Sequence, residues 1–347
     1  MAIDQLPRIR LGTFPTPFER ASDLGTLLGL DSLWVKRDDL IGYSWGGNKV
    51  RPIEFILGDV EQRRADTVIV CGGPTSNFAA LMVAACVQRG LAVHHVSYGS
   101  RPVRVPAALE VSIRSGAVLE FTGSSDRTAM ETTANAVARQ LRAEGRSPYV
   151  LPRGGATAVG ALGFANAARE LTEQLEFLGI DSVTIVVPVG SGGTIAGLIT
   201  GWTYALETVG RAPPIAVEIV GVCVSRPPEE LRDSIESIVR DCGTSAAEGV
   251  LRPTASRCHW RLVDGRGAGF GMADIHDLEL VEEIGRQTRF LADITYNGKA
   301  LRWLRESAKQ LSGAIVYWHT GGALGVVDRI SDRSADWEAA RIEEFNQ

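Results

Sequence analysis

The sequence predicts an α/β protein of two domains, built on open, mostly parallel, twisted sheets with helices on both faces. Strand-like runs rich in Val and Ile, bounded by glycine, alternate with helix-like runs along most of the chain. Such near-continuous apolar strands are typical of parallel sheets that are covered on both faces. Glycine-rich and polar residues also follow the carboxyl ends of three predicted strands, the edge where open α/β sheets bind ligands. With 347 residues the chain is long enough for two or three domains.

The first half of the chain is predicted to alternate strands and helices after an initial strand in "DSLWVKRDDL". A helix-like run follows Lys49, because Val50, Ile53 and Ile56 recur at roughly helical spacing. Further strands are predicted in 66–73, 91–99 and 117–123, and helices in 78–90 and near 103–115.

In the second half, a strand in 182–190 leads to a helix from Thr194 to about Val209. Strands follow in 215–224 and 313–322. We expect a smaller domain inserted at about 53–155 and a larger domain formed by 1–52 and 156–347. A cofactor would lie in the cleft between them.

Composition and charge exclude several classes of protein. The net charge of −5 gives no electrostatic case for nucleic acid or an anionic membrane. No window reaches the ~20 apolar residues of a membrane span, and the N-terminus lacks the apolar core of a signal peptide. The cysteines are odd in number and scattered, without a CxxC pair, so we expect reduced thiols in the cytoplasm and no metal site. They are Cys71, Cys86, Cys223, Cys242 and Cys258.

The segment "VGSGGTIAGL" follows a predicted buried strand and opens a helix. Glycines let successive backbone N–H groups converge on an anion, and the helix N-terminus favours negative charge. We therefore predict a phosphate-binding loop. The alternative is a tight turn with Thr194 as the helix N-cap. The predicted loop consists of Gly190, Ser191, Gly192, Gly193 and Thr194.

The segment "CGGPTSNFAA" places Ser76 and Asn77 just before a helix. One interpretation is helix capping. The other is that the free N–H groups and the hydroxyl hold a carboxylate.

Lys49 stands in "GYSWGGNKVRPIEF", directly after two glycines and an asparagine. A solvated surface lysine needs no such setting. A lysine amine forms a Schiff base with an aldehyde, and pyridoxal phosphate carries both an aldehyde and a phosphate. An amino-acid substrate would supply the carboxylate. The three features together predict a pyridoxal-phosphate enzyme, in which Gly46 and Gly47 leave room for a flat ring.

The chain resembles the pyridoxal-phosphate enzymes of the tryptophan synthase β type (fold type II). Within them it resembles the 1-aminocyclopropane-1-carboxylate deaminase / D-cysteine desulfhydrase group. The pattern "KRDDL…GGNKxRxxEF" is specific, and the matching segments are collinear over nearly the whole chain. They include "LPRIRLGTFPTPFERASDLG", "CGGPTSNFAA", "LPRGGATAVGALGF", "VPVGSGGTIAGL", "DITYNGKAL" and "YWHTGGALG".

The resemblance implies a role for each matching position. Lys49 would link to the cofactor and move the substrate α-proton, and residues 190 to 194 would bind the phosphate. Asn77 would hydrogen-bond the ring hydroxyl, and Ser76 would contact substrate as the proposed nucleophile. Tyr296 matches an active-site tyrosine, for which a packed aromatic is the alternative. Asn297 would face the pyridine nitrogen, and Thr320 and Gly321 would flank the ring.

The chain departs from the family pattern around the substrate. Thr75 replaces a glutamine and Phe78 stands where His or Gln is usual, while Trp45 replaces a smaller aromatic and narrows the pocket. The deaminase "GYG" segment reads "GAGFG", with Ala268. Neutral Asn297 replaces an acidic residue, which makes the ring a weaker electron sink.

These departures favour a lyase that removes the α-proton of a small amino acid and eliminates a β-substituent, as D-cysteine desulfhydrase does. The products would be a keto acid and ammonia. Two alternatives remain open: β- or γ-replacement by a transferase, and cyclopropane ring opening. The resemblance also implies a homodimer.

Overall fold

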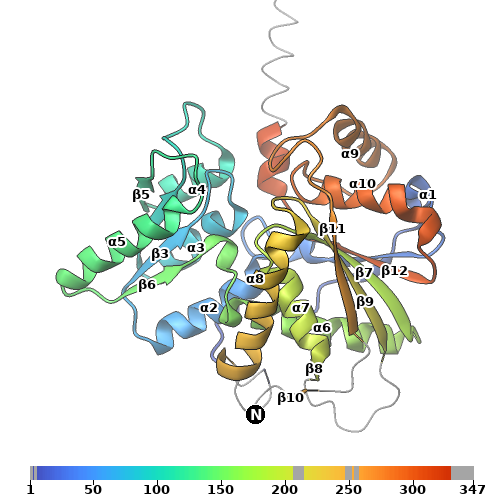
Figure 1. Cartoon of the computed structure of the whole chain (residues 1–347), viewed down its shortest axis with the longest axis horizontal. Helices are drawn as coiled ribbons and strands as arrows, with labels where there is room; N and C mark the ends of the chain where they lie inside the picture. Colours follow the sequence, from blue (N-terminus) through green and yellow to red (C-terminus); the bar gives the residue numbers. More distant parts are fainter. Residues whose placement is uncertain (1–2, 4–5, 206–214, 247–251, 254–257, 330–347) are drawn as a thin grey trace, which may run out of the picture.

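The structure is a computed structural model that describes residues 3, 6–205, 215–246, 252–253 and 258–329. Its two main sheets lie side by side (Figure 1). The larger has six strands in the order β1-β2-β12-β7-β9-β11, all parallel to their neighbours except β1, which is antiparallel to β2. Its strands are β1 (Phe18–Arg20), β2 (Leu33–Arg37), β7 (Ser182–Val189), β9 (Ala216–Cys223), β11 (Cys258–Asp264) and β12 (Ala314–His319).

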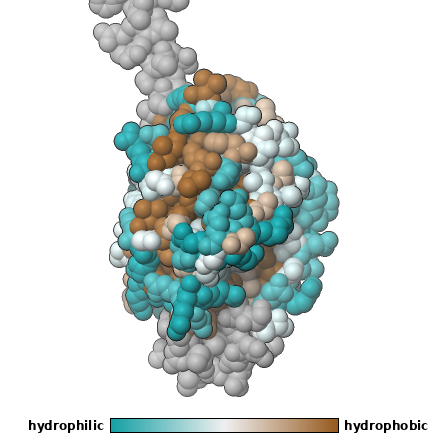
Figure 2. All heavy atoms as spheres, turned by 90° about the vertical axis from the view of Figure 1, so that its left-hand side faces the viewer, coloured by the Kyte–Doolittle hydropathy of each residue, from teal (hydrophilic) through white to brown (hydrophobic). Residues whose placement is uncertain are grey.

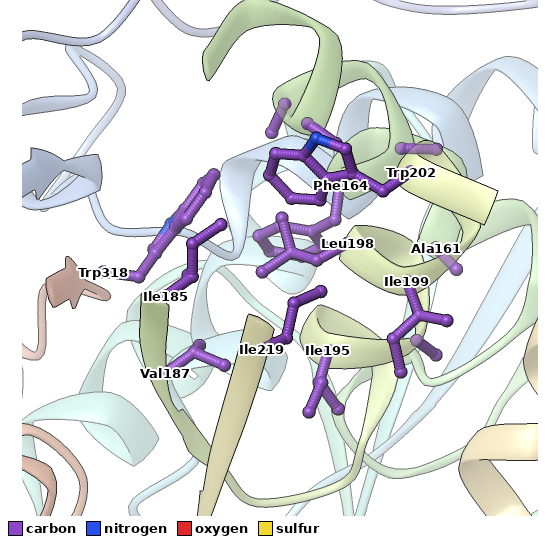
Figure 3. Close-up of a cluster of buried hydrophobic side chains, with 14 of the residues drawn as sticks. Ala161, Phe164, Ile185, Val187, Ile195, Leu198, Ile199, Trp202, Ile219 and Trp318 are labelled. Atoms are coloured by element: carbon purple, nitrogen blue, oxygen red, sulfur yellow. The ribbon is translucent and has the colours of Figure 1, made fainter. Parts of the chain in front are cut away.

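Helices cover both faces of the six-stranded sheet. Along β7, Ile185 and Val187 pack into one apolar cluster, whereas Val186 packs into another on the opposite face. Figure 3 shows the first cluster, to which β7 contributes Ile185 and Val187 and the helix above it contributes Leu198. The first face carries α6 (Ala158–Phe177), α7 (Gly193–Thr203) and α8 (Pro228–Asp241), and the second carries α1 (Ser22–Leu28), α9 (Ile275–Gln287) and α10 (Asn297–Ser307).

The smaller sheet is fully parallel, in the order β5-β4-β3-β6. Along β3, Val68 and Val70 face α2 and α3, and Ile69 and Cys71 face α5. Its strands are β3 (Thr67–Cys71), β4 (Ala92–Ser97), β5 (Val118–Phe121) and β6 (Pro148–Leu151). The helices around it are α2 (Val50–Gln62), α3 (Asn77–Val87), α4 (Ala107–Arg114) and α5 (Ala129–Ala143).

Short elements complete the described chain. A two-stranded ribbon pairs β8 (Tyr204–Ala205) with β10 (Arg252–Pro253). The helical turns are η2 (Asp38–Leu40), η3 (Arg153–Gly155), η4 (Cys242–Ala246) and η5 (Ala308–Gln310), and a further helix begins at Ala323. Within the described residues, no helix combines the length and apolarity that a membrane crossing requires.

The predicted fold class is confirmed, since parallel sheets carry helices on both faces. Each predicted strand is present within one or a few residues of its expected bounds. The helix expected to reach Val209 ends at Thr203, and Val209 lies outside the described residues. The strands of the smaller sheet fall between Thr67 and Leu151. The domain boundaries at 52/53 and 155/156 stay a prediction.

Candidate active site

A cavity of about 800 Å³ opens at the carboxyl ends of strands from both sheets. Its walls are the loop before α2 and the loops that follow β3, β6, β7, β9 and β12. This is the edge at which open α/β sheets bind ligands. The three segments that the sequence analysis selected therefore meet in one place.

Lys49 is the residue immediately before α2, and its half-buried side chain lines this cavity. Within the described residues, its amine has no hydrogen-bond or ion-pair partner. Burial lowers the pKa of Lys49 to about 8. The positive end of α2 acts in the same direction. The amine can therefore lose its proton at a pH close to neutrality.

Gly46 and Gly47 allow the loop before Lys49 to pack tightly against other backbone. Both have positive φ, 66° and 86°, a region that side-chain-bearing residues rarely adopt. A Cβ atom on Gly46 would lie 2.7 Å from the carbonyl oxygen of Ile41, and one on Gly321 would lie 2.6 Å from the Cα of Gly47. Neighbouring backbone thus fills the space beside these glycines. The glycines are needed for this close packing, and not to make room for a flat ring as expected above.

Asn48 connects the Lys49 loop to two other walls of the cavity. Its side-chain amide donates to Thr194 Oγ1 at 3.1 Å, and its backbone N–H donates to the carbonyl oxygen of Thr320 at 3.0 Å. Asn48 is itself buried. The lysine loop, the glycine loop and the loop after β12 are therefore fixed relative to one another.

The glycine loop between β7 and α7 has the features of an anion site. Because α7 begins at Gly193, its first N–H groups have no acceptor inside the helix. Gly190, Ser191, Gly192 and Thr194 line the cavity, while Gly193 is buried behind them. Thr194 lies inside the helix and its hydroxyl accepts from Asn48, so it is not the N-cap that the alternative interpretation required.

The loop after β3 brings Thr75, Ser76, Asn77 and Phe78 to the cavity wall. Ser76 is the N-cap of α3, and its hydroxyl oxygen accepts from the N–H of Ala79 at 3.2 Å. Ser76 therefore caps the helix, as the first interpretation predicted, and the same residue also lines the cavity. Trp45 also lines the cavity and is half exposed at its mouth.

Tyr296, directly before α10, reaches the cavity from the larger sheet. Its ring meets Phe270 edge-on, with the ring centroids 5.8 Å apart. Burial, together with the negative charge of Asp293, raises the pKa of Tyr296. The phenol is consequently protonated at neutral pH and able to donate a hydrogen bond.

Asn297 is fully buried and does not line the cavity. Its amide nitrogen donates to Asp293 Oδ1 and to the carbonyl oxygen of Gly321. Its oxygen accepts from the backbone N–H and the hydroxyl of Thr320, both at 3.2 Å. Asn297 thus positions Thr320 and Gly321, which do line the cavity.

Several further lining residues were missed by the sequence analysis, among them three arginines and an aromatic residue. Arg153 and Arg226 follow β6 and β9, so the strand-end rule that selected the glycine loops would have found them. Arg127 precedes α5, where no motif marks it. Phe270 belongs to the "GAGFG" segment, in which the sequence analysis named Ala268, an exposed residue, and not Phe270.

Comparison with known proteins assigns the family. Residues 9–321 match the family described as "Pyridoxal-phosphate dependent enzyme". D-cysteine desulfhydrase of Salmonella paratyphi C (strain RKS4594) is 31% identical over 331 residues, which cover 92% of this chain and 95% of that protein. The bifunctional D-cysteine desulfhydrase/1-aminocyclopropane-1-carboxylate deaminase, mitochondrial, of Arabidopsis thaliana is 30% identical, covering 96% of this chain and 83% of that one. The crystal structure of an ACC deaminase homologue superposes with a TM-score of 0.81 at 29% identity, covering 93% and 94% of the two chains. Because the family match spans most of the sequence, the chain belongs to the pyridoxal-phosphate-dependent enzyme family.

Proposed function

We propose that the protein is a lyase that eliminates a β-substituent from a small amino acid and releases a keto acid and ammonia. The observation that supports this most is the link through Asn48. It fixes Lys49, whose amine has no partner among the described residues, against the glycine loop at the start of α7. A ligand that carries both an aldehyde and a phosphate matches those two features, and such a ligand is the cofactor of the family.

The residues present fit pyridoxal phosphate. Lys49 would hold it through its Nζ, and the amides of Gly190, Ser191, Gly192, Gly193 and Thr194 would hold its phosphate. Asn77 would hydrogen-bond the ring hydroxyl, and Thr320 and Gly321 would flank the ring. When bound, the cofactor supplies an aldehyde that links to amines and a ring that accepts the electrons released at the α-carbon.

The protein's own groups would perform the remaining steps. Ser76 and the free N–H groups at the start of α3 would bind the substrate carboxylate, with Thr75, Phe78 and Trp45 around it. Lys49, whose pKa is about 8, would take the α-proton onto its Nζ. Tyr296 would place its protonated hydroxyl beside the reacting carbons.

The desulfhydrase relatives, rather than the charge at Asn297, favour elimination over the alternatives. Asn297 carries no charge, and its amide is occupied by Asp293, Gly321 and Thr320. Its side chain does not line the cavity and so offers no contact to a ring there, whereas Asp293 does line the cavity.

The test is Lys49→Ala, measured by the visible absorbance of the bound cofactor and by release of keto acid and ammonia from a panel of D- and L-amino acids. We expect both signals to disappear, while Lys309→Ala, at an exposed position, retains them. A fully active Lys49→Ala enzyme would refute the scheme. Formation of a new amino acid in the presence of a nucleophile would instead identify β- or γ-replacement, and turnover of 1-aminocyclopropane-1-carboxylate would identify ring opening.

We further propose that the enzyme acts in the cytoplasm as a homodimer. Four of its five cysteines are buried and none is paired, in keeping with a reducing compartment. On the half that carries the four-stranded sheet, brown apolar groups gather between hydrophilic ones (Figure 2). Val118, on the edge strand β5, and Val103 are exposed apolar residues of this half. Light scattering of the purified protein tests this: the mass of two chains would support the homodimer, and the mass of one chain would contradict it.

A further inference from the structure

Three arginines line the cavity beside the residues assigned above. Arg127 comes from the segment before α5, Arg153 from the turn after β6 and Arg226 from the end of β9. All three side chains are half-buried. They belong to three different elements, so only the folded protein brings them together.

In the part of the chain that the structure describes, no carboxylate pairs with these guanidinium groups, although Glu131, Asp233, Asp241 and Asp293 line the same cavity. Within the described residues, none of the three forms an ion pair or donates a hydrogen bond. Burial, and then the positive charges of Arg226 and Arg127, lower the pKa of Arg153, more strongly than the nearby Glu131 raises it. Placing like charges together without a counterion costs free energy, which a bound anion recovers.

Arg127 lies on the substrate side of the cavity. Its guanidinium carbon is 5.4 Å from the centre of the Tyr98 ring and 4.5 Å from that of Phe270. The Tyr98 ring packs on Gly73, at the start of the loop that carries Ser76. Phe270 packs on Tyr296. Arg127 is therefore held between the proposed carboxylate loop and the proposed proton donor.

Arg226 closes the cluster near the glycine loop. The hydroxyl of the preceding residue, Ser225, donates to the carbonyl oxygen of Gly190 at 2.8 Å. The glycine loop already offers a helix N-terminus to the cofactor phosphate. The three guanidinium groups come in addition to the backbone amides of the glycine loop and of the start of α3, which already offer donors to the cofactor phosphate and the substrate carboxylate.

We propose that Arg127, Arg153 and Arg226 bind a second anion on the substrate, a sulfonate or phosphate group attached to the β-carbon. This inference rests on the function proposed above and names the substrate class. Guanidinium groups match such oxyanions through paired N–H donors. The leaving group gains negative charge as it departs, so the arginines would stabilise the transition state more than the bound substrate.

The reaction balances for both kinds of leaving group. In cysteate the Cβ–S bond breaks and its electron pair stays on sulfur. With one water, the products are pyruvate, ammonium and hydrogen sulfite. In O-phosphoserine the Cβ–O bond breaks and the oxygen keeps the pair, so that pyruvate, ammonium and hydrogen phosphate form, again with one water.

The first test compares substrates on the holoenzyme. We expect kcat/KM for D- or L-cysteate, or for O-phosphoserine, to exceed that for cysteine and β-chloroalanine of the same configuration by about tenfold or more. Equal or faster turnover of the neutral substrates would overturn the proposal and leave the elimination reaction standing. Comparing kcat/KM for cysteate with that for O-phosphoserine shows whether the site prefers a sulfonate or a phosphate.

The second test uses Arg127→Gln, Arg153→Gln and Arg226→Gln. Each should lower the ratio of kcat/KM for the anionic substrate to that for the neutral one by about tenfold. Arg139→Gln, at an exposed position on α5, should keep the ratio. If the variants instead lose cofactor and keep the ratio, the arginines serve the cofactor phosphate and the proposal is wrong.

A binding measurement separates this inference from the proposed function. Calorimetric titration with 3-sulfopropanoate, which lacks the amino group and cannot react, should show binding that weakens about tenfold in the arginine variants. Propanoate, without the sulfonate, should bind more weakly than 3-sulfopropanoate to the wild type. If no amino acid yields a keto acid while 3-sulfopropanoate still binds in this way, the lyase function fails and the anion site stands. Absence of that binding overturns the site.

Discussion

Lys49 is the residue whose setting the sequence predicted best. Gly46, Gly47 and Asn48 precede it, and the structure shows what each of them does. The glycines permit positive φ and close backbone packing, and Asn48 ties the loop to Thr194 and Thr320. The sequence could indicate that this lysine needs a special backbone, because glycine carries that information locally. The sequence could not indicate which backbone segments pack against these glycines.

The buried amine of Lys49 should make the cofactor-free protein less stable at neutral pH. Its pKa falls from ~10.4 in an unfolded chain to about 8 in the folded one. Between these values the unfolded state binds more protons, so stability rises with pH in this window. We expect Lys49→Met to be the more stable protein at pH 7, with the difference shrinking towards pH 10. Urea unfolding of both cofactor-free proteins measures this, and a difference that grows with pH would contradict it.

Tyr296→Phe removes one hydroxyl while keeping the ring that packs on Phe270. Because the phenol stays protonated, we expect its loss to lower kcat by about 10²- to 10⁴-fold, the usual contribution of a positioned acid. Steady-state kinetics would show the effect in kcat with a small change in KM. An unchanged kcat would show that Tyr296 is only a packed aromatic residue, as the alternative interpretation holds.

Other residues of the site could not be predicted from the sequence, for reasons of geometry. Arg127, Arg153 and Arg226 are single arginines far apart in the chain, and only the packing of the two sheets brings them to one cavity. Asn297 is adjacent to Tyr296 in sequence, yet its side chain points into the protein, towards Asp293 and Gly321. Sequence proximity does not give side-chain direction at the first turn of a helix.

Among the elements, the loop after β11 is held by a buried lysine from α10. The amine of Lys299 donates to the carbonyl oxygens of Arg266 and Gly269. These residues flank the turn that carries Phe270 into the cavity. The loop is therefore ordered by α10, the same helix that begins beside Tyr296.

Lys299→Met should loosen this loop without altering Lys49, the lysine proposed to bind the cofactor. The carbonyl of Gly269 loses this donor, while that of Arg266 keeps the N–H of Gly269. We expect the change to lower the free energy of unfolding by about 1–3 kcal/mol and to raise KM, because Phe270 and Arg127 lose a fixed partner. Denaturant unfolding and kinetics would measure the two effects. Lys309→Met is the matched control at an exposed site. Wild-type KM in Lys299→Met would show that the loop orders itself.

The sequence predicted the buried strands well because their apolar runs are continuous. Strand β7, "SVTIVVPV", is buried along most of its length, since helices cover both faces of the sheet. Strand β11, "CHWRLVD", was not identified. It lies at the edge of the sheet, alternates partly buried with exposed residues and has a weaker apolar pattern. Edge position is a property of the assembled sheet, which local sequence does not encode.

For the whole molecule, a buried ionic network joins β2, α2 and α6 beneath the active site. Glu170 accepts from Lys36 at 2.5 Å and from Arg51 at 3.0 Å, while Arg51 also donates to Asp38 at 2.7 Å. Thr16 donates to the same two carboxylates. The specific pattern "KRDDL…NKxRxxEF" thus supplies both Lys49 and charges that hold its helix in place.

Glu170→Gln should leave Lys36 and Arg51 without their shared counterion and destabilise the protein by about 3–5 kcal/mol. Burial raises the pKa of Glu170, but the charges of Arg51 and Lys36 outweigh it and lower the pKa to about 2. The stabilisation is therefore complete above the unfolded value of ~4.3 and is lost as pH falls towards 2. Denaturant unfolding at pH 7 and at pH 3 should show a smaller difference from wild type at pH 3. Glu173→Gln, exposed on the same helix, serves as the control, and a difference as small as in that control would contradict the network's role.

The central claim is that Lys49 and the glycine loop at residues 190–194 bind opposite ends of one cofactor. A crystal structure of the holoenzyme tests it most directly. We expect continuous electron density from Lys49 Nζ into a pyridine ring, with the phosphate on the amides of residues 190–194. Density for the phosphate elsewhere in the cavity, for instance on Arg153 and Arg226, or a Lys49 amine free of the ring, would contradict the account.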